Sequence, residues 1–174
     1  MAATFIVEDG TGLEDANAYA DEAYADAYHE NYGAPSEWTA STSDEKKAAI
    51  REATRFLDAS FSSRWRGARA NKLQALDHPR IRVVDTDGWA RDSNVVFVEV
   101  KSATAILALK VRQGVSLLPD VEASDVGISS ESVSVGPISE SKTYAGTKRT
   151  YKRFSMVEAT LRPIIERAGR RERA

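Results

Sequence analysis

The stretch SSRWRGARANKLQALDHPRIRV, residues 62–83, lies between the two clearest helical patterns of the chain, so its conformation determines how they pack. It shows no helical periodicity, and Trp65 stands among arginines at positions 64, 66 and 69. Two interpretations are open. The segment could grip nucleic acid through basic and stacking side chains. Alternatively, Trp65 anchors the core and its arginines brace the surrounding turn.

The segments on either side predict two amphipathic helices. Before it, apolar residues from Ala49 to Phe61 recur at helical spacing, and Ser43 is the expected N-cap. After it, residues 94–114 carry a second stripe, with Asn94 as the expected N-cap and Gly114 at the end. We expect these two helices to pack as the centre of one domain.

Two shorter helices and a polar arm complete the pattern. Asp21 is the expected N-cap of a helix that ends near Gly33, with His29 on its exposed-looking face. Ser155 and Glu158 predict a capping box at the start of the last helix. Residues 128–144 are rich in Ser and Glu and turn at positions 136 and 137, which predicts a polar β-hairpin or a pair of extended arms. A hairpin this poor in apolar residues needs a neighbour to rest on.

The predicted fold class is therefore mainly α. We expect a small bundle of about four helices with a long polar hairpin or extended arm inserted before the C-terminal helix. The whole chain, 1–174, is predicted to form one domain. Its parts are a helical core over 1–125, the arm over 126–152, and the C-terminal helix with a basic tail over 153–174.

Composition excludes several classes of protein. The chain has 174 residues, 42% of them hydrophobic and 29% charged, which is normal for a globular protein with one core. It contains no cysteine, so disulfides, thiolate catalysis and cysteine-ligated metals are excluded. The first residues lack a signal-peptide pattern, and the apolar runs are too short for a membrane span. We expect a soluble protein without a membrane role that is not exported by the general secretory route.

Residues that carry catalytic chemistry are scarce. The only histidines, His29 and His78, lack the spacing of a metal site, and no phosphate-binding glycine loop or nucleophile-elbow pattern is present. The DTDG sequence at residues 85–88 resembles the start of a calcium loop, but the remaining ligands are missing, so we expect a plain turn. The sequence predicts no enzyme, no cofactor and no metal.

The net charge of −2 conceals a gradient along the chain. The first 37 residues contain nine acidic side chains and no lysine or arginine, whereas residues 142–174 contain ten basic side chains and three acidic ones. This pattern suits contacts between neighbouring copies, or a basic tail that meets an acidic partner. The alternative is that both ends are simply solvated.

The order of these features, together with one motif, resembles a known family. The motif is Arg64-Trp65-x-Gly67-x-Arg69, followed by Gln74-x-Leu76 and then Pro79-Arg80. This layout resembles tailed-phage proteins usually labelled DnaT-like single-stranded-DNA-binding proteins, which commonly lie beside head genes and are similar in layout to head–tail connector adaptors. The chain departs from the family pattern at His78, where relatives tend to have an aromatic residue. It departs again at Val95-Val96, where a proline is common.

The resemblance implies a structural virion protein at the neck of the particle, assembled in the host cytoplasm. Copies would form a ring, expected to be a dodecamer, that binds the portal protein above and a stopper or tail terminator below, and that lines the channel for double-stranded DNA. The expected core anchors are Trp65, Gln74, Leu76 and Pro79. The expected portal or partner contacts are Arg162, Arg167, Arg170, Arg171 and Arg173. The expected ring contacts are Ile128, Val133, Val135, Ile138 and Tyr144.

The family label itself implies a different function, that of a DnaT-like single-stranded-DNA-binding replication protein. In that alternative the nucleic-acid contacts are Arg64, Arg66, Arg69 and Lys72. Only one aromatic residue lies among these cations, whereas single-strand grooves favour several stacking platforms. The adaptor interpretation is preferred because it also accounts for the polar arm and for the absence of catalytic residues.

Overall fold

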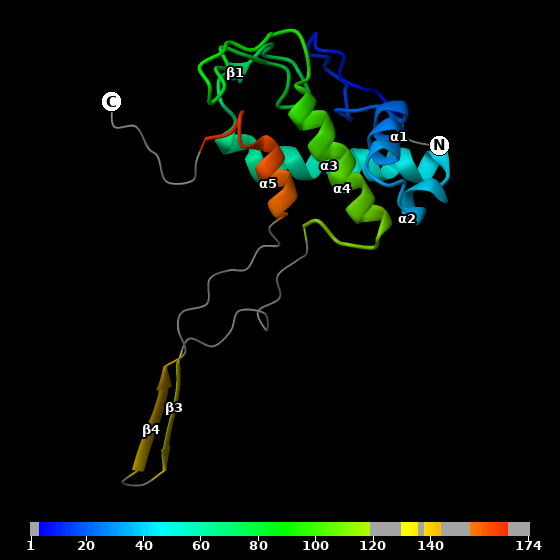
Figure 1. The fold of residues 1–174 in the computed structure, drawn as a ribbon. Helices are drawn as coiled ribbons and strands as arrows, with labels where there is room; N and C mark the ends of the chain where they lie inside the picture. Colours follow the sequence, from blue (N-terminus) through cyan, green and yellow to red (C-terminus); the bar gives the residue numbers. More distant parts are fainter. Residues whose placement is uncertain (1–3, 119–129, 136–137, 144–153, 167–174) are drawn as a thin grey trace. The chain divides into compact units, whose positions relative to one another are not determined.

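The computed structural model describes residues 4–118, 130–135, 138–143 and 154–166 (Figure 1). The chain divides into two compact units, residues 1–117 with 154–174 and residues 118–153, and each is described by itself. Five α-helices and one two-stranded antiparallel hairpin are the main elements of the described residues, so the predicted mainly α class is confirmed.

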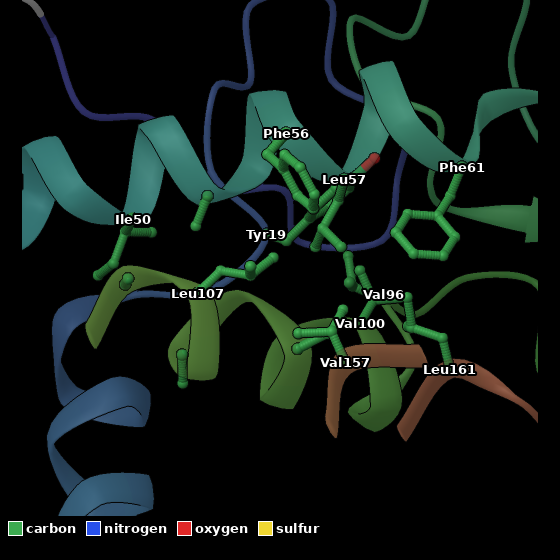
Figure 2. Packing of buried hydrophobic residues seen from close by; sticks show 14 of the residues in the cluster. Tyr19, Ile50, Phe56, Leu57, Phe61, Val96, Val100, Leu107, Val157 and Leu161 are labelled. Carbon is green, nitrogen blue, oxygen red and sulfur yellow. The ribbon is translucent and has the colours of Figure 1, made fainter. Parts of the chain in front are cut away.

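The centre of the first unit is the pair of long helices that the periodicity predicted. Helix α3 (Ser43–Phe61) packs most extensively on α4 (Val98–Arg112), and α5 (Ser155–Leu161) also packs on α4. Their facing side chains form the core shown in Figure 2. Each fully buried aliphatic or aromatic side chain of this size contributes ~1.5–3 kcal/mol. The core includes Ile50 and Leu57 of α3, Val100 and Leu107 of α4, and Val157 and Leu161 of α5.

The starts of three helices differ from the predictions. Thr42, not Ser43, is the N-cap of α3, where it forms a capping box with Glu45. Helix α4 begins at Val98 after Phe97, so the predicted cap at Asn94 is wrong. Residues 94–97 instead cross the N-terminal loop and bury Val96 and Phe97 in the core. The predicted capping box of the last helix is also wrong, because α5 follows Phe154 without a side-chain cap.

Two short helices cover one end of the core. Helix α1 (Glu22–Asn31) begins as predicted at Asp21, whose side chain accepts a hydrogen bond from the Tyr24 amide at 2.6 Å. Helix α2 (Ser36–Thr39) follows and buries Trp38. The expectation that His29 is exposed is wrong: its ring is buried, with Nε2 3.1 Å from the Ala105 carbonyl oxygen of α4.

The long connection between α3 and α4 is ordered by short pairings. The 3-10 helix η1 (Ser62–Arg64) continues α3, and β1 (Ala68–Arg69) pairs antiparallel with β2 (Arg80–Ile81). Near the start of the chain the buried Glu8 carboxylate accepts hydrogen bonds from three backbone amides of the loop at residues 10–13. The Leu13 carbonyl of that loop accepts from the Ala75 amide at 2.9 Å, which joins the two loops.

The described part of the second unit is the hairpin itself. Strand β3 (Ser130–Val135) pairs antiparallel with β4 (Ile138–Thr143), with Ser130 opposite Thr143 and Val135 opposite Ile138. Of the expected ring contacts, Val133, Val135 and Ile138 lie in these strands, whereas Ile128 and Tyr144 lie outside the described residues. Within the residues that are described, no helix is long and apolar enough to cross a membrane.

Replacing Gly67 by alanine is expected to destabilise the first unit strongly. Gly67 has φ +71°, and an added Cβ would lie 2.2 Å from the Ile81 carbonyl oxygen and 2.7 Å from Cγ2 of Val83. The left-handed backbone alone costs ~1–2 kcal/mol for a non-glycine residue. Gly114→Ala is the matched control, because Gly114 has φ +75° but an added Cβ would have no atom within 4 Å. Urea unfolding should show a clearly larger loss for Gly67→Ala, and equal losses would contradict the packing described.

Candidate functional site

Trp65 lies inside the protein, at the junction of three segments. Its side chain is only 4% exposed, and its ring centroid lies 4.6 Å from that of His78 and 5.7 Å from that of Phe61. Its backbone forms an antiparallel bridge with Ile165, just after α5. A nucleic-acid base cannot stack on a ring that solvent does not reach. Trp65 therefore does not form a stacking platform for single-stranded DNA in this structure.

The arginines around Trp65 bond mainly within the protein. Arg66 donates through Nη1 to the Val84 carbonyl at 2.9 Å, and Arg69 donates to the carbonyls of Gln74 and Leu76. Arg64 lies over the Phe61 ring at 5.1 Å and forms a long ion pair with Glu158 at 3.9 Å. Arginine donors that satisfy loop carbonyls hold the connection in shape.

Arg80 braces this region through backbone carbonyls, a role that its position in the sequence did not predict. It is 8% exposed and donates to the carbonyls of Arg66 and Gly67, each at 2.8 Å, and to that of Asp77 at 3.2 Å. The available signal was the Pro79-Arg80 pair inside the family motif. Burial of a guanidinium requires several acceptors, and backbone carbonyls supply them here.

The remaining predicted anchors lie in the same connection. Gln74 is 2% exposed and donates through Nε2 to the carbonyls of Leu76 at 2.7 Å and Pro79 at 3.1 Å. Its Oε1 accepts from the Asn71 amide at 2.8 Å. Leu76 and Pro79 are buried, and Lys72 is exposed. One amide side chain thus closes the loop from residue 71 to residue 79.

His78 is enclosed by aromatic rings. It is 1% exposed and lies edge-on to Tyr19, Trp65 and Phe97. Neither ring nitrogen has a hydrogen-bond partner within the described residues. Burial, with a contribution from the nearby Arg80 charge, lowers the pKa of His78 to about 3, so the ring is neutral at physiological pH.

The Tyr19 hydroxyl joins this cluster to α3. It accepts hydrogen bonds from the backbone amides of Asp77 at 2.9 Å and His78 at 3.2 Å, and it donates to the Asp58 carboxylate. Burial raises the pKa of Asp58 to about 6. As the pH falls below 7, His78 lowers the stability of the folded protein, because the unfolded chain takes up that proton first. Asp58 raises the stability, because the folded protein takes up that proton first.

The expected portal contacts fall at the C-terminal end of the chain. Arg162 follows α5 and is exposed. Arg167, Arg170, Arg171 and Arg173 lie outside the described residues.

An exposed tryptophan, Trp89, was missed by the sequence analysis. Its side chain is 73% exposed at the turn between Val84 and Ala90, which form an antiparallel bridge. The Asp85 carboxylate accepts hydrogen bonds from the Trp89 amide at 2.9 Å and from Arg91 at 3.1 Å. The DTDG sequence predicted the turn, but it did not indicate that the Trp89 ring after the turn would be exposed.

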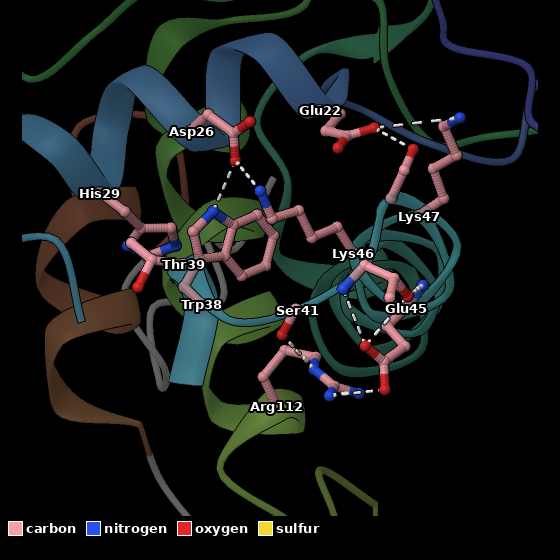
Figure 3. Close-up of polar contacts among 12 residues, drawn as sticks. Glu22, Asp26, His29, Trp38, Thr39, Ser41, Glu45, Lys46, Lys47 and Arg112 are labelled. Atoms are coloured by element: carbon pink, nitrogen blue, oxygen red, sulfur yellow. Dashed lines mark hydrogen bonds and ion pairs between the residues drawn. The ribbon is translucent and has the colours of Figure 1, made fainter. Parts of the chain in front are cut away.

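A pocket of about 300 Å³ lies at the end of the core covered by α1 and α2. Asp26 Oδ1 accepts hydrogen bonds from Trp38 Nε1 at 2.7 Å and from Lys46 Nζ at 2.8 Å (Figure 3). Burial lowers the pKa of His29, which keeps this pocket residue neutral at pH 7. No group of three potential metal ligands occurs among the residues that the structure describes. The lining residues are Asp26, His29, Glu30, Ala34, Trp38, Thr39 and Lys46.

The chain belongs to the family described as "Putative DnaT-like ssDNA binding protein", which it matches over residues 3–174. No curated protein and no solved structure was found to match it.

Truncating Trp65 is expected to cost stability. Trp65→Ala should lower the free energy of unfolding by ~3–5 kcal/mol, because it empties a packed site. Trp89→Ala is the matched control and should change stability by no more than ~0.5 kcal/mol, because its ring is exposed. Denaturant unfolding measures both variants. If Trp65→Ala left stability unchanged but abolished binding of a single-stranded oligonucleotide, Trp65 would be a stacking residue.

His78→Phe is expected to gain stability over the wild type as the pH falls. The unfolded chain protonates His78 near pH 6.5, whereas the folded protein resists protonation until about pH 3. The wild-type stability contribution of His78 is therefore complete above pH 6.5 and falls between these values. The gap between the variant and the wild type should widen by ~1.4 kcal/mol per pH unit below 6.5. Asp58 is present in both proteins and cancels in this difference. Urea unfolding at a series of pH values measures it, and a constant gap would contradict the burial of a neutral imidazole.

Proposed function

We propose that the protein is a head–tail connector adaptor of a tailed phage. In this function, copies form a ring beneath the portal, join the capsid to the tail and line the channel that passes double-stranded DNA. The layout of the chain and two structural observations support this function.

The observation that carries the proposal is the β3–β4 hairpin. Its strands pair over six positions, and its sequence is mostly Ser, Glu and Lys with few apolar residues. It belongs to a compact unit separate from the helical core. An isolated two-stranded hairpin is at best marginally stable in water. A neighbouring copy would supply the surface that the hairpin needs, and Val133, Val135 and Ile138 are the proposed ring contacts.

The second supporting observation is the internal role of the arginines near Trp65. Arg66, Arg69 and Arg80 donate to backbone carbonyls within their own loop. A groove for single-stranded DNA needs cations directed at phosphates and accessible aromatic rings. The buried Trp65 and the engaged arginines favour a structural function for this motif.

The proposed partners are the portal protein above the ring and a stopper or tail terminator below it. Arg162, exposed after α5, is the first of the basic side chains proposed to meet the portal. Contact with DNA in the channel would be weak and non-specific, because each neutralised phosphate adds salt-dependent affinity that hinders passage. We propose a structural protein without catalytic activity, present in the virion neck.

A second candidate function, single-stranded-DNA binding, is favoured by the family description and by one surface feature. Trp89 is exposed on a hydrogen-bonded turn, and Lys72 and Arg82 are exposed cations of the same connection. A lone exposed ring gives one stacking platform, worth ~1–3 kcal/mol per base. That is less than a non-specific single-strand binder requires.

Quantitative mass spectrometry of purified, DNA-filled particles tests the proposal. The copy number of this protein should be comparable to that of the portal protein in the same particles, because the two rings are stacked. The matched control is a sample of the same particles after protease treatment of their outer surface, which removes adhering cytoplasmic protein.

Absence of the protein from the particles would overturn the connector function. In that case, salt-dependent binding of the purified protein to an unstructured single-stranded oligonucleotide, lost in Trp89→Ala, would establish the second candidate function.

A further inference from the structure

Helix α5 is held on the first unit by apolar contacts rather than by its own stability. It packs on α4, and Figure 2 shows its buried residues Val157 and Leu161 in the core. The next apolar residues, Ile164 and Ile165, are 1% and 5% exposed. At seven residues and without a side-chain cap, α5 is too short to persist as a helix in water. It therefore behaves as a bound segment that needs this surface to fold.

The residues that follow α5 also pair with the backbone after α3. Trp65 forms an antiparallel bridge with Ile165. The two flanking hydrogen bonds run from the Arg66 amide to the Ile164 carbonyl at 3.1 Å and from the Glu166 amide to the Arg64 carbonyl at 2.8 Å. We call the surface of α4 and residues 64–66 that receives α5 and its following residues the α5 seat. The seat thus binds both by apolar burial and by backbone pairing.

The covalent link between the seat and α5 is long. Residues 118–153 join α4 to α5 and form a compact unit of their own. Helices that pack together in one bundle are usually joined by ~2–8 residues, so this link is several times longer than an α5 in its own seat requires. Both ends of the link are anchored on the first unit, since Leu117 is 2% exposed and Phe154 lies edge-on to Phe56 at 5.4 Å.

The link is long enough to reach a neighbouring copy. About ten residues lie between each strand of the hairpin and the first unit, and such a stretch spans at most ~35 Å. A compact body of the size of the first unit has a radius of gyration of ~14 Å. The length of the chain therefore permits α5 to fill either its own seat or that of an adjacent copy.

We propose that α5 is exchanged between copies when the protein assembles. In the isolated chain α5 fills its own seat, as in the structure, and in the ring it fills the seat of the next copy. The inference rests on the proposed ring, and it names the apolar contact of that ring. The donated helix and the seat are different surfaces, so the contact is heterologous and closes into a ring when the rotation allows.

A second copy is the occupant that the seat selects. Its α5 has the same sequence, so Val157, Leu161, Ile164 and Ile165 would make in the next copy every contact that they make in this one. Exchange of an identical element is a low-cost route to assembly, because no new surface has to be complementary.

The hairpin supplies the preference for exchange. Because both arrangements contain the same α5 contacts, a contact made only between copies decides which is more stable. The proposed contact of the β3–β4 hairpin with a neighbour is of this kind, and α5 follows the hairpin directly in the chain. Once the hairpin lies on a neighbour, that neighbour's seat is at a high effective concentration for α5.

Disulfide trapping tests the exchange, because the chain has no cysteine of its own. Residues 64 and 166 face each other beside the bridge, and facing residues of an antiparallel pair have Cα atoms ~4.5–5.5 Å apart, which a disulfide spans. The full-length variant Arg64→Cys with Glu166→Cys is oxidised as dilute purified protein and inside purified particles. Arg64→Cys with Met156→Cys is the matched control, since Met156 is 65% exposed on α5.

Non-reducing denaturing gels and mass spectrometry of the joined peptides distinguish the two arrangements. Dilute protein should give a single chain with an internal disulfide, which also shows that the variant folds with α5 in its seat. Particles should give covalent multimers that a reductant separates, and the control should give neither product. Single chains with the internal disulfide in particles, equal multimers in the control, or no internal disulfide in the dilute protein would overturn the exchange.

The copy number in particles separates this inference from the proposed function. A portal-like copy number with only single-chain disulfides would refute the exchange and leave the connector function intact. Covalent multimers of concentrated purified protein, with the protein absent from particles, would support the exchange and refute the connector function.

Discussion

One buried hydroxyl, that of Tyr19, joins the N-terminal segment to α3 and to the connection that follows α3. It donates to Asp58 of α3 and accepts from the backbone amides of Asp77 and His78. The Tyr19 amide also donates to the Thr54 hydroxyl of α3 at 3.2 Å. Buried polar groups that lose their partner cost ~1–3 kcal/mol each, so this single group constrains three others at once.

The geometry of the whole connection from α3 to α4 follows from that constraint. Tyr19 fixes the backbone at His78, and the His78 ring then packs edge-on against Trp65 and Phe97. With these rings in place, Arg80 reaches the carbonyls of Arg66 and Gly67, and β1 can pair with β2. A phenylalanine at position 78 would occupy the same box of rings without two unpartnered nitrogens. His78 thus fills the box of rings and adds a sensitivity to acid.

The sequence predicted which segments form α3 and α4 more accurately than the residues at which the helices begin. It also predicted buried anchor residues more accurately than it predicted exposed ones. The stripes of α3 and α4 are periodic over many residues, so their existence was evident. The start of α4 was not, because tertiary contacts of Val96 and Phe97 override the capping preference of Asn94. For the arginines of residues 64–69, the sequence left two functions open, nucleic-acid binding and bracing of the turn. It could not decide between them, because the acceptors are backbone carbonyls that the sequence does not reveal. The burial of His29 and the exposure of Trp89 depend likewise on neighbours distant in sequence.

Under the proposed function, the polar character of the hairpin contact has a consequence for assembly. The hairpin is too polar to bury much apolar area, so its contact with one neighbouring copy is weak. Copies that are held side by side on one template meet at a high effective concentration, so weak contacts between them can form together. A template that gathers copies would provide that proximity. A ring built this way would be scarce in free solution and would assemble where the portal concentrates its subunits.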